Sequence, residues 1–495
     1  MVSTVEGSIA GPSEGTFDRA YANRTLVLLA IIAGLILYID IMLTPALPTI
    51  ANEYNVSIAQ TSLLVSLYTV FGVAVMPIVG KLGDIYGKKR VMVATLAVYL
   101  GFATTTSFSP TFNLILVSRF FQGVGLGVLP LCYSLAREEF PRNLVPRAQG
   151  LISAVQIAGS GLGLLAGAIV TLDYGWQANY RLALPCILIL TVVTVLIVRE
   201  SPNRKPGVHL DYVGAAGLGA ALTAIVLGLS EGATWGWGSL AIVGLVFGGL
   251  LSLVPLGIYE SRKTEPVLDL KLLRQRNVLI ANLMILASGI STYIAFQAIT
   301  YFMQLPSPAG FGLSIVQAGL CFLPLIVVVM PVAFGVGVIL PKYGVRPFLF
   351  IGPILGVIGF FLLSTASNPL EVVSYLMVYA VYSGVISVSI QNLLVLSLDK
   401  REMGLGTSLN SVFRYVGQSI GAPVSGAILS TYVIMDSING HAVSLPTHLA
   451  FQYCFYTASI TIAVVCALSL LAREVLGPRQ GKGPLPEADK SSLHG

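Results

Sequence analysis

Long apolar stretches alternate with short polar segments along almost the whole chain. A helix needs about 20 predominantly apolar residues to cross a bilayer, and fourteen stretches approach this length. They lie at 25–50, 60–80, 91–109, 112–136, 147–172, 180–199, 211–230, 237–259, 277–303, 312–339, 346–366, 369–397, 403–432 and 449–472. The pattern predicts an all-α integral membrane protein with 14 transmembrane helices.

The composition supports this prediction and excludes a water-soluble protein. Of the 495 residues, 55% are hydrophobic and only 10% are charged, and the mean hydropathy is +0.84. Soluble domains have a charged fraction of about 25%. The chain is therefore expected to lie almost entirely within a membrane.

The positions of lysine and arginine predict the orientation. Cytoplasmic loops of membrane proteins keep positive charge, and translocated loops lose it. With the N-terminus in the cytoplasm, almost all of the 28 basic residues fall in cytoplasmic segments. We expect a multi-pass protein of the cell membrane with both termini in the cytoplasm. The net charge of +6 then reflects topology, and no nucleic-acid partner is expected.

Two segment pairs indicate an internal repeat, as is common in transporters. GKLGDIYGKKR at 80–90 lines up with GVILPKYGVRP at 337–347 and pairs Gly87 with Gly344. QIAGSGLG, starting at Gln156, lines up with RYVGQSIG, starting at Arg414, at nearly the same offset. The repeat predicts two six-helix bundles of like orientation, with the two helices between 211 and 259 as an extra central pair.

The expected domain organisation follows from the repeat. It consists of a cytoplasmic tail at 1–24, a first bundle at 25–200, the two extra helices with their linkers at 201–276, a second bundle at 277–472 and a cytoplasmic tail at 473–495.

Four short motifs occur in the first half of the chain. The segment after the second stretch contains Gly80, Leu82, Asp84, Gly87, Lys88, Lys89 and Arg90, with Gly83 at a small-residue position. The fourth stretch contains Arg119, Gln122, Gly123 and Gly125. The fifth contains Gly150, Gly159, Gly163 and Gly167. The first contains Asp40, Ala46, Leu47 and Pro48.

On these motifs the chain resembles the major facilitator superfamily, and specifically its fourteen-span drug:proton antiporters. The resemblance implies the major facilitator fold and transport by alternating access. The chain departs from the antiporter patterns at Leu164, Ala168 and Ile85, where the patterns have proline, glycine and arginine.

Asp40 is the acidic residue of the first apolar stretch. A carboxylate at membrane depth costs about 2.5–3.5 kcal/mol, and desolvation favours its neutral form. Asp40 can therefore gain and lose a proton, as a proton-coupling site requires. Arg119 cannot usefully release its proton, so its role is to stabilise ionised Asp40 or to orient water. The alternatives are a permanently ionised Asp40 that pairs with a base or caps a broken helix, and an Arg119 that only ties helices together.

Further polar or aromatic residues lie isolated in apolar stretches and are candidates for lining a substrate cavity. They are Tyr68, Gln122, Gln156, Tyr293, Gln297, Tyr301, Gln391, Asn392 and Arg414. Ordinary hydrogen bonding between helices is the alternative for each of them.

Two sets of residues are candidates for gating and packing. Gly159, Gly163 and Gly167 recur every four residues on one helical stripe, where backbones can approach closely. The resemblance implies that this helix limits proton leak. Gly80, Gly83, Asp84, Lys88 and Arg90 form a turn whose carboxylate can meet a helix N-terminus of the other bundle. The alternatives are ordinary packing and a solvated basic loop.

The predicted function is export of small amphipathic or drug-like molecules, coupled to protons, by a membrane protein that is not an enzyme. The expected partners are the substrate, protons and the lipid bilayer; the energy source is the proton gradient, and no cofactor, metal or partner subunit is expected. With no second deep acidic residue, neutral or singly charged substrates are favoured over dications. An importer or facilitator of a small metabolite with the same fold is the alternative, and a non-transporting receptor or channel is a more distant one.

Overall fold

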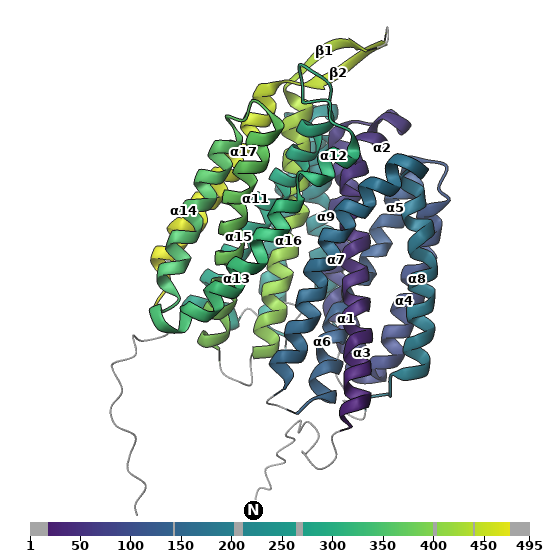
Figure 1. Cartoon of the computed structure of the whole chain (residues 1–495), viewed down its shortest axis with the longest axis vertical. Coiled ribbons are helices and arrows are strands. Elements are labelled where there is room, and N and C mark those ends of the chain that lie inside the picture. The colour runs from purple at the N-terminus through teal and green to yellow at the C-terminus, as the bar shows by residue number, and fades with distance from the viewer. Residues whose placement is uncertain are drawn as a thin grey trace, which may run out of the picture.

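A computed structural model describes residues 18–141, 144–201, 211–263, 271–398, 403–438 and 441–475. Most of its helices run along one common direction (Figure 1). We name the end that holds Asp18 and the start of α1 (Arg19–Ile41) the N-terminal face. The opposite end, which holds strands β1 (Val433–Ile438) and β2 (His441–Pro446), is the hairpin face (Figure 1).

The remaining elements follow in chain order. They are η2 (Thr44–Ala46), α2 (Leu47–Tyr54), α3 (Ile58–Tyr86), α4 (Lys88–Ser107), α5 (Phe112–Gln122), η3 (Gly123–Gly127), α6 (Val128–Glu139), α7 (Val145–Tyr174), α8 (Trp176–Ile197), α9 (Tyr212–Trp235), α10 (Leu240–Ser261), η4 (Leu272–Arg274), α11 (Arg276–Gln304), α12 (Ile315–Leu320), α13 (Leu323–Tyr343), α14 (Arg346–Leu363), α15 (Pro369–Ser397), α16 (Met403–Thr431) and α17 (His448–Leu471).

The prediction of a multi-pass helical membrane protein is confirmed. Within the described ranges, 12 helices are long and apolar enough to cross a membrane. Helices α4 and α16 coincide with the other two predicted spans and have 20 and 29 residues. Both contain many hydroxyl, amide or charged side chains, such as Thr104 and Arg414, which lower their mean hydropathy.

Three predicted spans, namely the first, the fourth and the tenth, which divides into α12 and α13, are interrupted where proline or glycine is present. The first ends as an α-helix at Ile41 and continues through η2 into α2, with Pro45 and Pro48 at the interruption. The fourth divides into α5 and α6 around the glycine-rich η3. Proline lacks the amide donor that a continuous helix needs, and glycine disfavours a helix interior.

The strands are a feature that the prediction of an all-α fold did not include. β1 and β2 form a two-stranded antiparallel sheet in which Val433 pairs with Pro446. The sheet projects from the ends of α16 and α17 (Figure 1). It therefore extends the hairpin face beyond the helix ends (Figure 1).

The helices pack into two groups with one pair between them. Helices α1 to α8 pack mainly on one another and form what we name the N-terminal bundle. Helices α11 and α13 to α17 do likewise and form the C-terminal bundle; the short α12 belongs to the same half of the chain but packs mainly on α7. The extra pair α9 and α10 pack on each other, and α9 also contacts α3 and α16. Helix α9 therefore lies where the two bundles meet.

A row of glycines brings α7 against the backbone of α1. A Cβ atom at Gly163 would lie 2.6 Å from the carbonyl oxygen of Tyr38. Cβ atoms at Gly159 and Gly167 would collide with the carbonyl oxygens of Gly34 and Met42. Only hydrogen fits at these three positions, so the predicted glycine stripe is a backbone contact.

The C-terminal bundle repeats this contact between α16 and α11. A Cβ atom at Gly417 or Gly421 would collide with the carbonyl oxygen of Leu286 or Ile290. The sequence alignment paired Gly417 with Gly159 and Gly421 with Gly163. The internal repeat is therefore visible as the same helix contact in both bundles.

The other aligned segments also share a structure, at the N-terminal face. Gly87 and Gly344 have positive φ angles of 105° and 84°, which favour glycine. Glu200 accepts hydrogen bonds from the backbone amides of Lys89 and Arg90 at the start of α4. Glu474 accepts them from Val345 and Arg346 at the start of α14. A carboxylate is favourable at such helix N-termini.

Three hydrogen bonds join the two bundles towards the hairpin face. The hydroxyls of Thr61 and Tyr301 are 2.6 Å apart. The amide of Ala59 donates to Ser430 Oγ at 3.2 Å, and the side chain of Gln304 donates to the carbonyl of Pro45 at 3.0 Å. The bundles are therefore held together on this side.

The α1–α7 contact predicts an unequal effect of one substitution at two sites of α7. Gly159→Ala should destabilise the protein by about 1–3 kcal/mol, because the added methyl group overpacks the contact. Gly150→Ala, whose Cβ meets nothing within 4 Å, should be neutral or stabilise by up to about 1 kcal/mol. Thermal unfolding of the purified variants measures both. Equal melting temperatures for the two would contradict the contact.

Candidate functional site

Asp40 and Arg119 form a buried ion pair inside the N-terminal bundle. Asp40 Oδ1 lies 3.8 Å from Arg119 Nη2, and the exposed fractions of the two side chains are 3% and 0%. Each residue occupies the last turn of its helix, α1 or α5, just before the interruption. The negative end of a helix dipole favours a cation and disfavours an anion. Both helix ends therefore favour charged Arg119 and oppose ionised Asp40.

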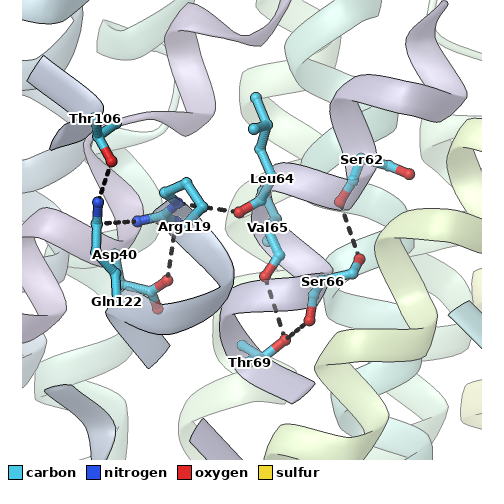
Figure 2. Close-up of polar contacts among 9 residues, drawn as sticks. All are labelled: Asp40, Ser62, Leu64, Val65, Ser66, Thr69, Thr106, Arg119 and Gln122. Carbon is cyan, nitrogen blue, oxygen red and sulfur yellow. Dashed lines mark hydrogen bonds and ion pairs between the residues drawn. The ribbon is translucent and has the colours of Figure 1, made fainter. Parts of the chain in front are cut away.

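Arg119 is held in place by groups other than Asp40 (Figure 2). Its Nε donates to the carbonyl of Leu64 at 3.1 Å, and its Nη1 donates to Gln122 Oε1 at 3.4 Å. Its guanidinium lies 4.5 Å from the ring centre of Tyr68. The arginine can therefore keep its position when Asp40 changes its protonation state.

Gln122 connects this arginine to a further helix. Its amide nitrogen donates to the hydroxyl of Thr106 on α4 (Figure 2). It also donates to the carbonyl of Phe102 on the same helix at 3.1 Å. Gln122 is fully buried. Its contacts are those of a positioning residue for Arg119.

A small cavity lies next to the ion pair and receives residues from both bundles. Tyr293 and Gln297, on α11, line it, and Gln297 is 2% exposed. In the part of the chain that the structure describes, neither amide atom of Gln297 has a hydrogen-bond partner. The other lining residues are Ile41, Thr44, Leu47, Val65, Phe296 and Ala422. Two of the predicted cavity residues, Tyr293 and Gln297, thus line the same cavity as Ile41, the residue that follows Asp40.

A second polar cluster involves Gln156 and Arg414. The hydroxyl of Tyr133 donates to Gln156 Oε1 at 3.3 Å and lies 2.9 Å from Ser153 Oγ. Arg414 is exposed and interacts electrostatically with Tyr133 of the other bundle. We name the region between these residues the inter-bundle space, defined by Tyr133, Gln156 and Arg414.

Three other predicted cavity residues lie elsewhere. Tyr301 is buried in the Thr61 contact that joins the bundles. The side chain of Asn392 donates to the carbonyl of Val388 in its own helix at 2.8 Å. Gln391 is exposed on α15. The structure therefore does not bring these three together with Asp40.

The predicted gating turn makes its contacts inside the N-terminal bundle. Asp84 lies 3.4 Å from Lys88, and Lys88 also contacts Glu138. Arg90 lies 3.6 Å from Glu200. In this conformation Asp84 pairs with Lys88, one helical turn away, and its contact with a helix N-terminus of the other bundle stays a prediction.

The two glycines of this turn differ in their surroundings. A Cβ atom at Gly83 would meet the side chain of Leu131 on α6, whereas one at Gly80 would meet nothing within 4 Å. Only Gly83 is therefore required for packing.

Sequence reasoning missed two buried tyrosines beside Arg119. Tyr99 and Tyr180 are 0% exposed, and both interact electrostatically with Arg119. The sequence feature that singled out Tyr68, an isolated tyrosine in an apolar stretch, is also present at Tyr99 and Tyr180 and could have identified them.

One serine also has the spacing of a hydrolase motif. Ser230 lies in GLSEG at 228–232, which fits the pattern of a nucleophilic serine at a turn between strand and helix. Ser230 instead lies within helix α9, and its Oγ is 3.3 Å from Ser62 Oγ. The helix position excludes that geometry, and the residue serves helix packing.

Two helix bundles that meet around polar groups, with a buried acid at membrane depth, are typical of secondary transporters. The chain belongs to the Major Facilitator Superfamily, whose family model matches residues 27–422. It is accordingly a multi-pass membrane protein of this superfamily.

The relatives of the chain include transporters of known and unknown substrate. An uncharacterised transporter of this superfamily from Mycobacterium tuberculosis is 28% identical over 86% of this chain. The chain spans 62% of the length of that relative. The multidrug transporter protein MdtP of Bacillus subtilis is 24% identical over 81% of this chain and 74% of its own length.

A solved structure supports the fold. A bacterial homologue of the human lysosomal transporter Spinster, in an inward-facing and unoccupied conformation, superposes with a TM-score of 0.66. It is 13% identical and covers 92% of this chain and 97% of its own.

The ion pair predicts a pH-dependent cost of removing Arg119. Arg119→Gln should destabilise the protein by about 3–5 kcal/mol at about pH 8, because an ionised Asp40 is left buried without its partner. The loss should become smaller at about pH 5, because the variant then gains stability by binding a proton at Asp40. Thermal unfolding at the two pH values measures this.

A matched variant separates this effect from a general loss of charge. Arg90→Gln removes a side chain that is 70% exposed in its pair with Glu200, so its cost should stay below about 1 kcal/mol. A loss for Arg119→Gln that is equal at both pH values, or is matched by Arg90→Gln, would refute the pairing.

Proposed function

We propose that the protein exports small amphipathic or drug-like molecules in exchange for protons, by alternating access of its two bundles. The observation that carries this proposal is a buried Asp40 only 3.8 Å from an arginine that has independent anchors. A carboxyl group in such a site can be ionised beside its counter-ion or be protonated, and the balance between the two forms can differ between conformations. Proton coupling needs that difference.

The orientation belongs to the same proposal. We place the N-terminal face in the cytoplasm, because Lys88, Arg90 and Arg346 lie at helix starts on that face and cytoplasmic segments keep positive charge. The hairpin face is then external, and the bonds between Thr61 and Tyr301 and between Ala59 and Ser430 hold the external side shut. A substrate enters the inter-bundle space from the cytoplasm.

The position of Asp40 suggests how proton and substrate are coupled. Asp40 precedes the interruption of α1, and Ile41 and Thr44 at this interruption line the small cavity with Tyr293. Opening the external side moves α11 relative to α1 and exposes this region to external protons. Protonation removes the charge that pairs with Arg119, and a return to the internal conformation releases the proton into the cytoplasm.

The glycine contacts give each bundle a tightly packed pair of helices that can move together. Helix α7 is locked to α1 through Gly159 and Gly163, and α16 is locked to α11 through Gly417 and Gly421. The bundles can therefore rock as units, with their hydrogen bonds at the hairpin face opening and closing. Fourteen membrane spans and membership of the drug:proton antiporter subfamily are parts of this proposal.

The energy of one proton is sufficient for useful export. A membrane potential of 100 mV supplies about 2.3 kcal/mol per charge. Because about 1.4 kcal/mol corresponds to a tenfold ratio, one proton can sustain a gradient of roughly 40-fold for a neutral substrate. The name of MdtP, a multidrug transporter, supports drug-like molecules as the substrate class.

The test is transport by the purified protein in liposomes with an imposed pH gradient. Lipophilic dyes of negative, zero and positive charge are supplied, and dye concentration and internal pH are recorded. Wild-type protein should concentrate at least one dye against its gradient, in the direction opposite to proton flow. Asp40→Asn should lower this concentration ratio to about 1, because an amide cannot carry the proton, while downhill exchange of the dye continues.

Asp173→Asn is the matched control, since Asp173 is an exposed carboxylate on α7 and its loss should leave transport unchanged. Undiminished uphill transport by Asp40→Asn would refute the role of Asp40. Movement of dye and protons in the same direction would identify an importer instead.

A further inference from the structure

Arg414 is an exposed cation in α16, a helix that crosses the membrane in the proposed fourteen-span topology. It lies roughly 16 Å along α16 from Met403, which is near the middle of a bilayer core of about 30 Å. A guanidinium cannot become neutral, and an isolated charge at this depth is costly. Arg414 therefore needs water, a counter-charge or a charged ligand.

The two deep arginines differ in how this need is met. Arg119 is fully buried and has Asp40, Leu64 and Gln122 as partners. Arg414 is exposed and lies 5.1 Å from the ring centre of Tyr415. Over the described ranges, no acidic side chain forms an ion pair with Arg414. Its positive charge remains available to a ligand.

Unpartnered amide groups accompany this charge on both bundles. Gln418 follows Arg414 by one helical turn and shares its face. Counting only residues that the structure describes, the buried Gln418 Oε1 has no hydrogen-bond partner, and neither has the buried Gln156 Nε2 on α7. Tyr133 lies close to groups of both bundles: its hydroxyl donates to Gln156 of the N-terminal bundle and interacts electrostatically with Arg414 of the C-terminal bundle. One cation, one donor and one acceptor thus belong to helices that border the inter-bundle space.

The internal repeat makes the charge of this space asymmetric. Arg414 and Gln156 are the aligned first residues of the two repeat segments, so equivalent positions hold a cation and a neutral amide. Asp40 and Arg119 compensate each other within the N-terminal bundle. The side chain of Arg414 is therefore the uncompensated charge of this residue set.

We infer that Arg414 anchors an anionic group of the transported molecule, so that amphipathic organic monoanions are preferred over neutral or cationic analogues. This inference rests on the proposed transport function and specifies its substrate class. A guanidinium binds carboxylate or sulfonate with two parallel, charge-assisted hydrogen bonds. Gln156 and Gln418 can bind the remaining polar groups of the ligand. Tyr293 and Phe296, whose rings stack at 6.3 Å, offer contact for its apolar part.

Three fluorescent probes that differ mainly in charge test this inference. Dansylglycine is anionic, dansylglycinamide is neutral and dansylcadaverine is cationic at neutral pH. Binding to the purified protein and transport by the protein in liposomes are measured separately for each probe. Wild-type protein should bind dansylglycine about tenfold or more tightly than dansylglycinamide, as a charge-assisted contact requires.

Variants at position 414 distinguish an anchor from a structural residue. Arg414→Gln should weaken dansylglycine binding about tenfold and leave dansylglycinamide binding unchanged. Arg414→Lys should restore part of the anion preference, and Arg414→Glu should shift the preference to dansylcadaverine. Arg181→Gln removes an exposed arginine of α8 and should change none of these ratios.

The outcomes separate this inference from the proposed function. Wild-type protein without saturable dansylglycine binding, or with equal affinity for the neutral probe, would overturn the anchor. So would an Arg414→Gln variant that loses affinity for all three probes alike. Binding with the predicted charge preference but without transport of any probe supports the anchor and contradicts export.

Discussion

A guanidinium cannot be neutralised, so at membrane depth it needs a counter-charge and hydrogen-bond acceptors. Arg119 obtains these through contacts that involve four helices. Arg119 belongs to α5 and forms an ion pair with Asp40 of α1. It also donates a hydrogen bond to the carbonyl of Leu64 on α3. Through Gln122 it is tied to α4. Most of these contacts are independent of whether Asp40 is ionised. A fixed cation beside a carboxyl of variable charge is therefore the element around which the N-terminal bundle is arranged.

The internal repeat preserves backbone contacts in both bundles, whereas, in the described part of the chain, the buried pair of acid and base occurs only in the N-terminal bundle. The backbone contacts of Gly159 with Gly34 and of Gly417 with Leu286 occupy equivalent places, and so do the Glu200 and Glu474 contacts to the starts of α4 and α14. These features depend on backbone geometry, which duplicated sequence preserves. The charged side chains differ between the bundles, since Arg414 aligns with Gln156, and each additional buried charge is costly.

The sequence contained enough information for a helical membrane fold and for the proximity of Asp40 and Arg119, but less for the geometry around them. Apolar length predicted the spans, and the alignment of Gly159 with Gly417 predicted the repeat. The pairing of Asp40 with Arg119 could be inferred because each is costly alone at that depth.

The interruption after Ile41 was overlooked although Pro45 and Pro48 signal it. The strands were overlooked although Asn439 and Gly440, a dipeptide typical of hairpins, separate two runs rich in Val, Ile and Leu. Contacts between residues far apart in sequence, such as that of Glu200 with the start of α4, cannot be predicted from any local sequence pattern.

The distribution of groups between the bundles bears on how coupling can work. Asp40 and its anchored arginine belong to the N-terminal bundle, whereas Tyr293, Gln297 and Arg414 belong to the C-terminal bundle. Relative motion of rigid bundles therefore changes the surroundings of the carboxyl group without displacing the cation beside it. Because Thr44, at the interruption of α1, shares its cavity with Gln297, this interruption is where a change in protonation is closest to groups of the opposite bundle. A continuous helix at this point would hold Asp40 equally deep but would separate it from those groups by an unbroken, fully hydrogen-bonded backbone. In the proposed mechanism, coupling therefore depends on the break in α1 as well as on the acid that precedes it.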